Sequence, residues 1–133
     1  MAVYINGSER EVSGAILRDY LIAGNRTITL TLNEERDRIT FSENDVMFLD
    51  SAFEFIDHDD RQANYLLSRM YAPITQVGLG KATLLFFKSI TGATVWARRI
   101  HDQPTDGSHL TGDAPSFVAR MIDREILIDN RDN

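Results

Sequence analysis

The sequence has 133 residues, of which 43% are hydrophobic and 26% are charged, and its formal net charge is −6. The apolar content is sufficient for a hydrophobic core and excludes wholesale disorder, while the acidic balance argues against binding to duplex nucleic acid, which requires a basic surface. The chain contains no cysteine, which excludes disulfides and thiolate chemistry.

The N-terminal part predicts a short strand followed by a helix. Residues 2–5 suit a strand that enters the tight-turn pair Asn-Gly at 6–7. Apolar side chains then recur at helical spacing over residues 12–23, and the Gly-Asn pair at 24–25 is typical of a helix end. We therefore expect a helix over residues 12–23.

An antiparallel hairpin is predicted next. Residues 27–32 (TITLTL) alternate strictly, which places Ile28, Leu30 and Leu32 on one face. Residues 38–41 continue this alternation after a polar turn. We expect a hairpin with one buried face.

Residues 42–57 are ambiguous in the sequence. Ser42 and Asp45 have the spacing of a capping box, which would begin a helix. Aromatic and β-branched residues nevertheless dominate the segment, and Phe53 and Phe55 alternate with a glutamate. We expect strand character here, with a helix as the alternative.

A second helix is predicted over residues 63–71, where apolar residues form a helical stripe. Asp59 or Asp60 can cap its start, and Pro73 ends it. The charged sequence IDHDDR that precedes the stripe is thus interpreted as a helix cap, although its carboxylates and His58 could also bind a metal ion.

The remaining chain predicts a hairpin and a final helix. Residues 81–89 and 93–100 flank a Thr-Gly pair, and the apolar run at 83–87 is typical of a strand covered on both faces. Apolar residues between 117 and 126 have helical spacing, with Asp113 as a possible cap and Pro115 in the first turn.

These elements predict an α+β fold, with an antiparallel sheet of two or three hairpins and two or three packed helices. We expect one domain over residues 1–128 and a flexible polar tail at 129–133. No signal peptide or membrane-spanning run is present, so we expect a cytoplasmic protein with no membrane partner. Exposed hairpin edges favour a homo-oligomer.

The glycine pair in VGLGKAT (77–83) invites comparison with a phosphate-binding loop. The required spacing is G-x-x-x-x-G-K-[ST], yet the chain has Thr75 where the first glycine should stand and Ala82 where Ser or Thr should follow Lys81. The predicted context, a helix before and a strand after, is also wrong for that motif. We interpret the segment as a glycine turn that enters a strand.

The strongest candidate site is a group of arginines. Arg98 and Arg99 end a predicted strand beside Trp96, and Arg120 and Arg124 lie four residues apart, so they share one helix face. Guanidinium groups bind phosphate and carboxylate bidentately and stack on aromatic rings. The alternative interpretation is an ordinary surface network of salt bridges.

The segment 101–115 connects the two pairs of arginines. Its histidines and aspartates do not have the spacing of a metal motif, and we interpret it as the rim of the site, to which His109 contributes. Trp96 would stack on a bound ligand.

The sequence therefore predicts a small non-enzymatic protein that captures an anionic small molecule, a nucleotide being one candidate, and it predicts no cofactor. One alternative is an acidic inhibitor or immunity-type protein that binds a basic protein partner through Asp57, Asp59 and Asp60. Another is a metal-dependent hydrolase that uses His58, His101 and His109.

Overall fold

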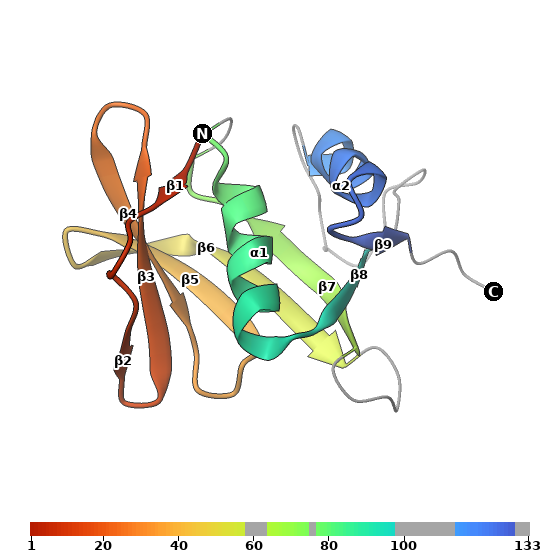
Figure 1. Ribbon diagram of the computed structural model, residues 1–133, viewed down its shortest axis with the longest axis horizontal. Helices are drawn as coiled ribbons and strands as arrows, with labels where there is room; N and C mark the ends of the chain where they lie inside the picture. The colour runs from red at the N-terminus through yellow and green to blue at the C-terminus, as the bar shows by residue number, and fades with distance from the viewer. Residues whose placement is uncertain (58–63, 75–76, 98–113, 130–133) are drawn as a thin grey trace.

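The computed structural model describes residues 1–57, 64–74, 77–97 and 114–129 (Figure 1). Over these residues the chain is mostly β, with a nine-stranded mixed sheet and two helices. The expected α+β fold of two or three antiparallel hairpins with two or three helices is therefore wrong. The elements are β1 (Val3–Tyr4), β2 (Arg10–Val12), β3 (Ala15–Ile22), β4 (Arg26–Leu32), β5 (Arg38–Glu43), β6 (Val46–Asp57), β7 (Asn64–Tyr71), α1 (Leu79–Thr91), β8 (Thr94–Ala97), α2 (Ala114–Asp123) and β9 (Ile128–Asp129).

The sheet has two parts of different topology. Strands β3 to β7 form an antiparallel meander, and both β1 and β2 pair with β3 at one edge. The chain then passes through α1 and returns as β8, which lies parallel to β7, and β9 pairs in parallel with β8. The β7–α1–β8 segment is thus a parallel crossover unit, which short hairpin connections cannot make.

The helix predicted over residues 12–23 is wrong, because most of this segment forms β3, which lies between two tight turns. Ser13 and Gly14 both have positive φ (53° and 86°) and connect β2 to β3, with Val12 opposite Ala15. Positive φ at both central residues matches the right-handed twist of a hairpin. The Gly-Asn pair at 24–25 also has positive φ and connects β3 to β4, so it is a hairpin turn and not a helix end.

Between residues 63 and 89, a segment predicted as a helix is a strand, and a segment predicted as a strand is helical. Residues 64–71, predicted as a helix, form β7, and residues 81–89, predicted as a strand, lie in α1. An apolar run buried on several sides has no clear period, so either element can contain it. Helix α1 ends at Gly92, whose φ is 65° and whose N–H donates to the carbonyl oxygen of Lys88.

Other expectations are confirmed. Residues 27–32 and 38–41 form the β4–β5 hairpin, and Ile28, Leu30 and Leu32 are fully buried on its inner face. Strand character over 42–57 is confirmed by β6, and the final helix by α2. Asp129, which was expected in the polar tail, pairs with Ala97 in the sheet, and residues 130–133 lie outside the described residues.

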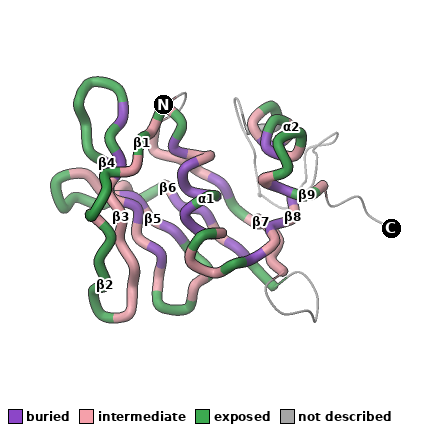
Figure 2. Tube along the Cα trace, viewed as in Figure 1, coloured by how far each residue is buried: buried purple, intermediate pink, exposed green. Residues whose placement is uncertain are grey.

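The core lies between α1 and one face of the sheet (Figure 2), where the buried segments of β4 to β7 meet the helix. The Phe87 ring of α1 stacks on the Phe55 ring of β6, with centroids 3.8 Å apart and planes 4° apart. Tyr65 of β7 meets Phe87 edge-on at 5.3 Å. An edge-to-face pair such as that of Tyr65 and Phe87 adds about 0.5–1.5 kcal/mol to the burial of its area. Neither helix is long and apolar enough to cross a membrane.

The start of α1 is packed closely on both sides through two glycines. A Cβ atom placed on Gly78 would lie 2.8 Å from the backbone nitrogen of Ala2, and one placed on Gly80 would lie 2.8 Å from the ring of Phe117. The N-terminal segment and α2 can therefore approach the first turn of α1 only because these positions lack side chains.

We predict that Gly78→Ala lowers the free energy of unfolding by roughly 2–4 kcal/mol, since a positive φ of 84° costs an L-residue about 1–2 kcal/mol and the contact with backbone adds to it. Gly7→Ala is the matched control, because Gly7 has a similar φ of 82° but open space around it. Urea denaturation of both variants measures the difference. An equal loss in the two variants would contradict the packing role of Gly78.

Candidate functional site

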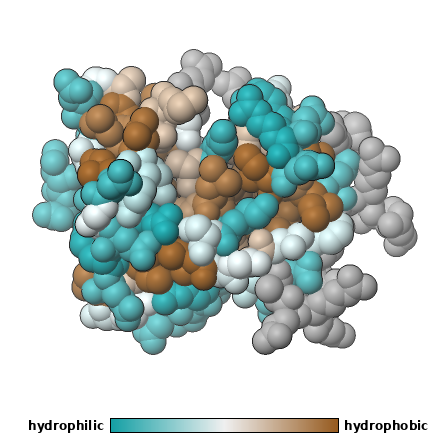
Figure 3. Space-filling model, in the orientation of Figure 1, coloured by the Kyte–Doolittle hydropathy of each residue, from teal (hydrophilic) through white to brown (hydrophobic). Residues whose placement is uncertain are grey.

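A cavity of about 770 Å³ lies beside α1. Its described walls come from the N-terminal residues and β1, from β3, β6, the end of β7 and the chain after it, from one face of α1, and from α2 and the residue after it. This volume is within the range of about 300–1,000 Å³ that is typical of sites for small organic ligands. Hydrophobic surface gathers near the centre of the face shown in Figure 3, over α1 and between more polar flanks.

The charged side chains in the described lining of the cavity are all cationic. Arg18, Lys81, Arg120 and Arg124 line it, and no aspartate or glutamate does. In a chain of net charge −6 this is a local reversal of sign. Lys81, Arg120 and Arg124 form no salt bridge with a carboxylate of the described residues, whereas Arg18 does. Three cations that have no carboxylate partner among the described residues thus line one cavity.

The first turn of α1 forms part of the same wall. Gly78, Leu79, Gly80 and Lys81 all line the cavity, no side chain caps the helix, and its first turn contains no acidic residue. The amide groups at a helix start carry partial positive charge and accept an anion readily. The partial positive charge of this turn therefore has the same sign as the charge of the arginine side chains.

The context of VGLGKAT differs from the one expected from sequence. Strand β7 precedes the segment and α1 begins at Leu79, so the order is strand, loop and helix. This is the order in which phosphate-binding loops occur. The spacing still departs from that motif at Thr75 and Ala82, and the two glycines have the packing roles described above.

Arg18 of β3 is held in the cavity lining by stacking, in part on Phe86 of α1, and by an ion pair. Its guanidinium lies 5.0 Å from the ring centroid of Tyr4 and 4.9 Å from that of Phe86. Its Nε and Nη2 lie 2.7 Å and 2.6 Å from the Oε1 of Glu9. Burial opposes the charge, but the interactions with Glu9 and Tyr20 together outweigh it and raise the pKa of Arg18. Arg18 is therefore a fixed cation whose charge is already balanced.

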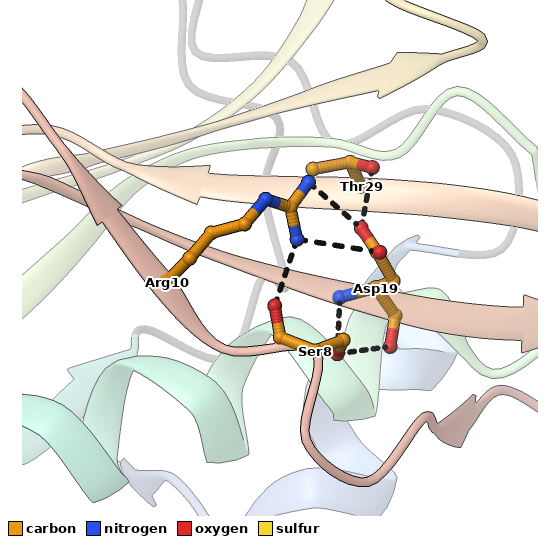
Figure 4. Close-up of polar contacts among 4 residues, drawn as sticks. All are labelled: Ser8, Arg10, Asp19 and Thr29. Carbon is orange, nitrogen blue, oxygen red and sulfur yellow. Dashed lines mark hydrogen bonds and ion pairs between the residues drawn. The ribbon is translucent and has the colours of Figure 1, made fainter.

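A polar clasp holds the segment that carries Glu9 (Figure 4). Arg10 donates to the carbonyl oxygen of Ser8 at 2.7 Å and pairs with the Asp19 carboxylate at 3.3 Å. The Asp19 N–H donates to the Ser8 hydroxyl at 3.0 Å, and Thr29 donates to Asp19 Oδ1 at 2.6 Å. These bonds fix residues 8–10 against β3 and so keep Glu9 beside Arg18.

The structure brings together part of the predicted site. Arg120 and Arg124 both line the cavity, and the N–H of Arg124 donates to the carbonyl oxygen of Arg120. Trp96 does not line it, because its indole N–H donates to Asn64 Oδ1 at 3.0 Å between β8 and β7. Arg98, Arg99 and His109 lie outside the described residues.

Sequence reasoning missed Arg18 and Lys81. Arg18 and Tyr20 lie two residues apart in β3, so their side chains lie on the same face of the strand. A strand assignment for residues 15–22 would have placed both on the core side. The helical interpretation of residues 12–23 hides this signal. Lys81 has no sequence signal beyond a glycine motif whose spacing fails.

The two alternative sites fall largely outside the described residues. His58, His101 and His109 do so, as do Asp59 and Asp60, whereas Asp57 is exposed at the end of β6. Within the described ranges no three acidic or histidine side chains lie close enough to hold a metal ion.

Comparison with protein-family models, with curated proteins and with solved structures gives no match. The function must therefore be argued from the cavity and its side chains.

The phenol of Tyr20, which is 5% exposed in the cavity wall, provides a test of this geometry. Burial raises its pKa above the ordinary value of 10.0, and the nearby Arg18 opposes the shift only in part. A raised pKa stabilises the fold below pH 10, and this stability is lost as the pH rises through the pKa of the folded state. We predict that Tyr20→Phe removes this part of the alkaline loss in chemical denaturation, while Tyr71→Phe is the control. A wild-type pH profile in the Tyr20→Phe variant would contradict the buried position of the phenol.

Proposed function

We propose that the protein is a non-enzymatic binding protein that captures an amphipathic organic anion, with nucleotides as one candidate class, in the cavity beside α1. The observation that carries this proposal is the lining itself: four cationic side chains and no carboxylate among the described residues, set in an otherwise largely apolar wall. Such a combination favours a ligand that has an apolar body and a negatively charged group.

The anionic group is assigned to the end of the cavity formed by Lys81, Arg120 and Arg124. These cations have no carboxylate partner among the described residues, so an incoming phosphate or carboxylate would not compete with an internal ion pair. Arginine can bind such a group through two parallel hydrogen bonds, and the first turn of α1 adds favourable backbone dipoles. Arg18 contributes less to the charge because Glu9 already balances it.

The body of the ligand is assigned to the apolar part of the lining. Half-buried Tyr4, Tyr71 and Phe117 offer ring surface to a planar group, and Leu85 and Ile74 offer aliphatic surface. Stacking of a base on an aromatic side chain contributes about 1–3 kcal/mol. A ligand with an aliphatic or an aromatic body would therefore fit the apolar wall. Selection among ligands would depend mainly on the charge of the anionic group.

Capture without catalysis is favoured by the kind of groups in the described lining. It contains neither a carboxylate nor an imidazole, which are the usual general bases of enzymes. A cysteine-free chain suits a reducing compartment, and we keep a cytoplasmic location as part of the proposal.

We predict that calorimetric titration detects binding of 1-naphthyl phosphate, octyl phosphate or AMP, and weaker binding of inorganic phosphate, which lacks an apolar body. In the double variant Arg120→Ala with Arg124→Ala the Kd should rise about tenfold or more, because a hydrogen bond to a charged group contributes about 1.5–3 kcal/mol.

The matched control is Arg26→Ala with Arg38→Ala, which removes the same charge from exposed positions outside the cavity lining. It should leave the Kd nearly unchanged. Absence of binding by all three organic phosphates would contradict the proposed function, and equal effects of the two double variants would contradict the site.

A further inference from the structure

The β5–β6 hairpin presents a group of exposed apolar side chains, here called the hairpin tip: Val46, Met47 and Leu49, with relative exposures of 69%, 52% and 82%. The hairpin turns at Asn44 and Asp45, both with positive φ, and Met47 lies opposite Ser42. Clustered apolar surface of this kind marks interaction sites more often than isolated exposed residues do.

The pairing of β5 with β6 is irregular next to the tip. Pairing with β5 passes from Met47 opposite Ser42 to Ala52 opposite Thr40, so residues 48–51 of β6 all correspond to Phe41 alone. A bulge of this kind bends the strand and re-aims its side chains. Leu49 projects from the bulge, while Phe48 packs against the core.

The charges of the hairpin tip are acidic. Asp45 and Asp50 flank the three apolar side chains, both are exposed, and neither forms a salt bridge with a cation of the described residues. The tip thus has apolar side chains between uncompensated carboxylates. The cavity beside α1 has the opposite character, apolar walls with uncompensated Lys81, Arg120 and Arg124.

We propose that the hairpin tip of one copy docks into the cationic cavity of a second copy of this chain. The apolar side chains of the tip match the apolar walls of the cavity, and the carboxylates of the tip match its ammonium and guanidinium groups. Such matching sets partner choice and orientation. Leu85, which lines the cavity and is 43% exposed, and the exposed Arg120 and Arg124 give the incoming tip both apolar and charged contacts at the rim.

The contact must be intermolecular. In Figure 1 the turn of the β5–β6 hairpin projects at the left, beyond β3 and β4, whereas α1 and α2 lie on the other side of these strands. Because the tip and the cavity are different surfaces, a dimer joined by one such contact keeps one free tip and one free cavity, through which further copies can add head to tail into a ring or a chain. This inference does not rest on small-molecule binding, although a ligand in the cavity would exclude the tip.

The test is sedimentation velocity of the purified full chain over a concentration series. The wild-type mass should rise with concentration and fall back at high salt, because the contact includes exposed charges. A tip variant, Val46→Thr with Leu49→Gln, and a cavity variant, Arg120→Ala with Arg124→Ala, should each associate about tenfold more weakly, as truncation of central contacts does. Ile56→Thr is the control, since Ile56 is exposed on β6 outside the tip.

Mixing the two variants gives the sharpest result. The tip variant keeps an intact cavity and the cavity variant keeps an intact tip, so the equimolar mixture should form a 1:1 dimer and nothing larger. A monomeric wild type, a tip variant that associates like wild type, or a mixture that forms no dimer would each overturn the proposal. Circular dichroism verifies that each variant is folded. The tip variant should still bind organic phosphates, so failure of assembly and failure of ligand capture are separable.

Discussion

The packing of α1 against the sheet is the constraint on which the rest of the structure depends. Phe87 stacks on Phe55 and meets the edge of Tyr65, which fixes the helix on β6 and β7. With the helix held there, its first turn comes to lie between the N-terminal segment and α2, and Gly78 and Gly80 permit both approaches. The cavity results from this arrangement, since three separate parts of the chain meet one helix face.

The sequence determines some of this fold visibly and some of it only through tertiary contacts. The strict alternation of TITLTL specifies a strand because one face is buried throughout. The run from Leu84 to Phe87 is continuously apolar and so shows neither helical nor strand periodicity. The sequence therefore could not distinguish this part of α1 from a strand. In β3 the positions Ile16 and Tyr20 fit both periods, and only the two-residue turn at Ser13-Gly14 decides between them.

The candidate site was predictable where it depends on spacing and not where it depends on topology. Arg120 and Arg124 were identified because residues four apart share a helix face, and both line the cavity. Arg18 comes from a strand more than 100 residues earlier in the chain, which no local pattern could connect with α2. Trp96, adjacent to the arginines in sequence, instead binds Asn64. Arg98, Arg99 and His109 of the predicted site lie outside the described residues, and the cavity that contains Arg120 and Arg124 lies beside α1.

If the first turn of α1 and the face of α2 receive an organic anion, as proposed, the backbone amide signals of these residues should respond to the ligand. Labelled protein can be titrated with 1-naphthyl phosphate while its backbone amide shifts are recorded. We expect the largest changes at Leu79, Gly80 and Lys81 and around Arg120, with smaller changes near Arg18. Changes confined to the outer strands, or no saturable change at any described residue, would contradict it.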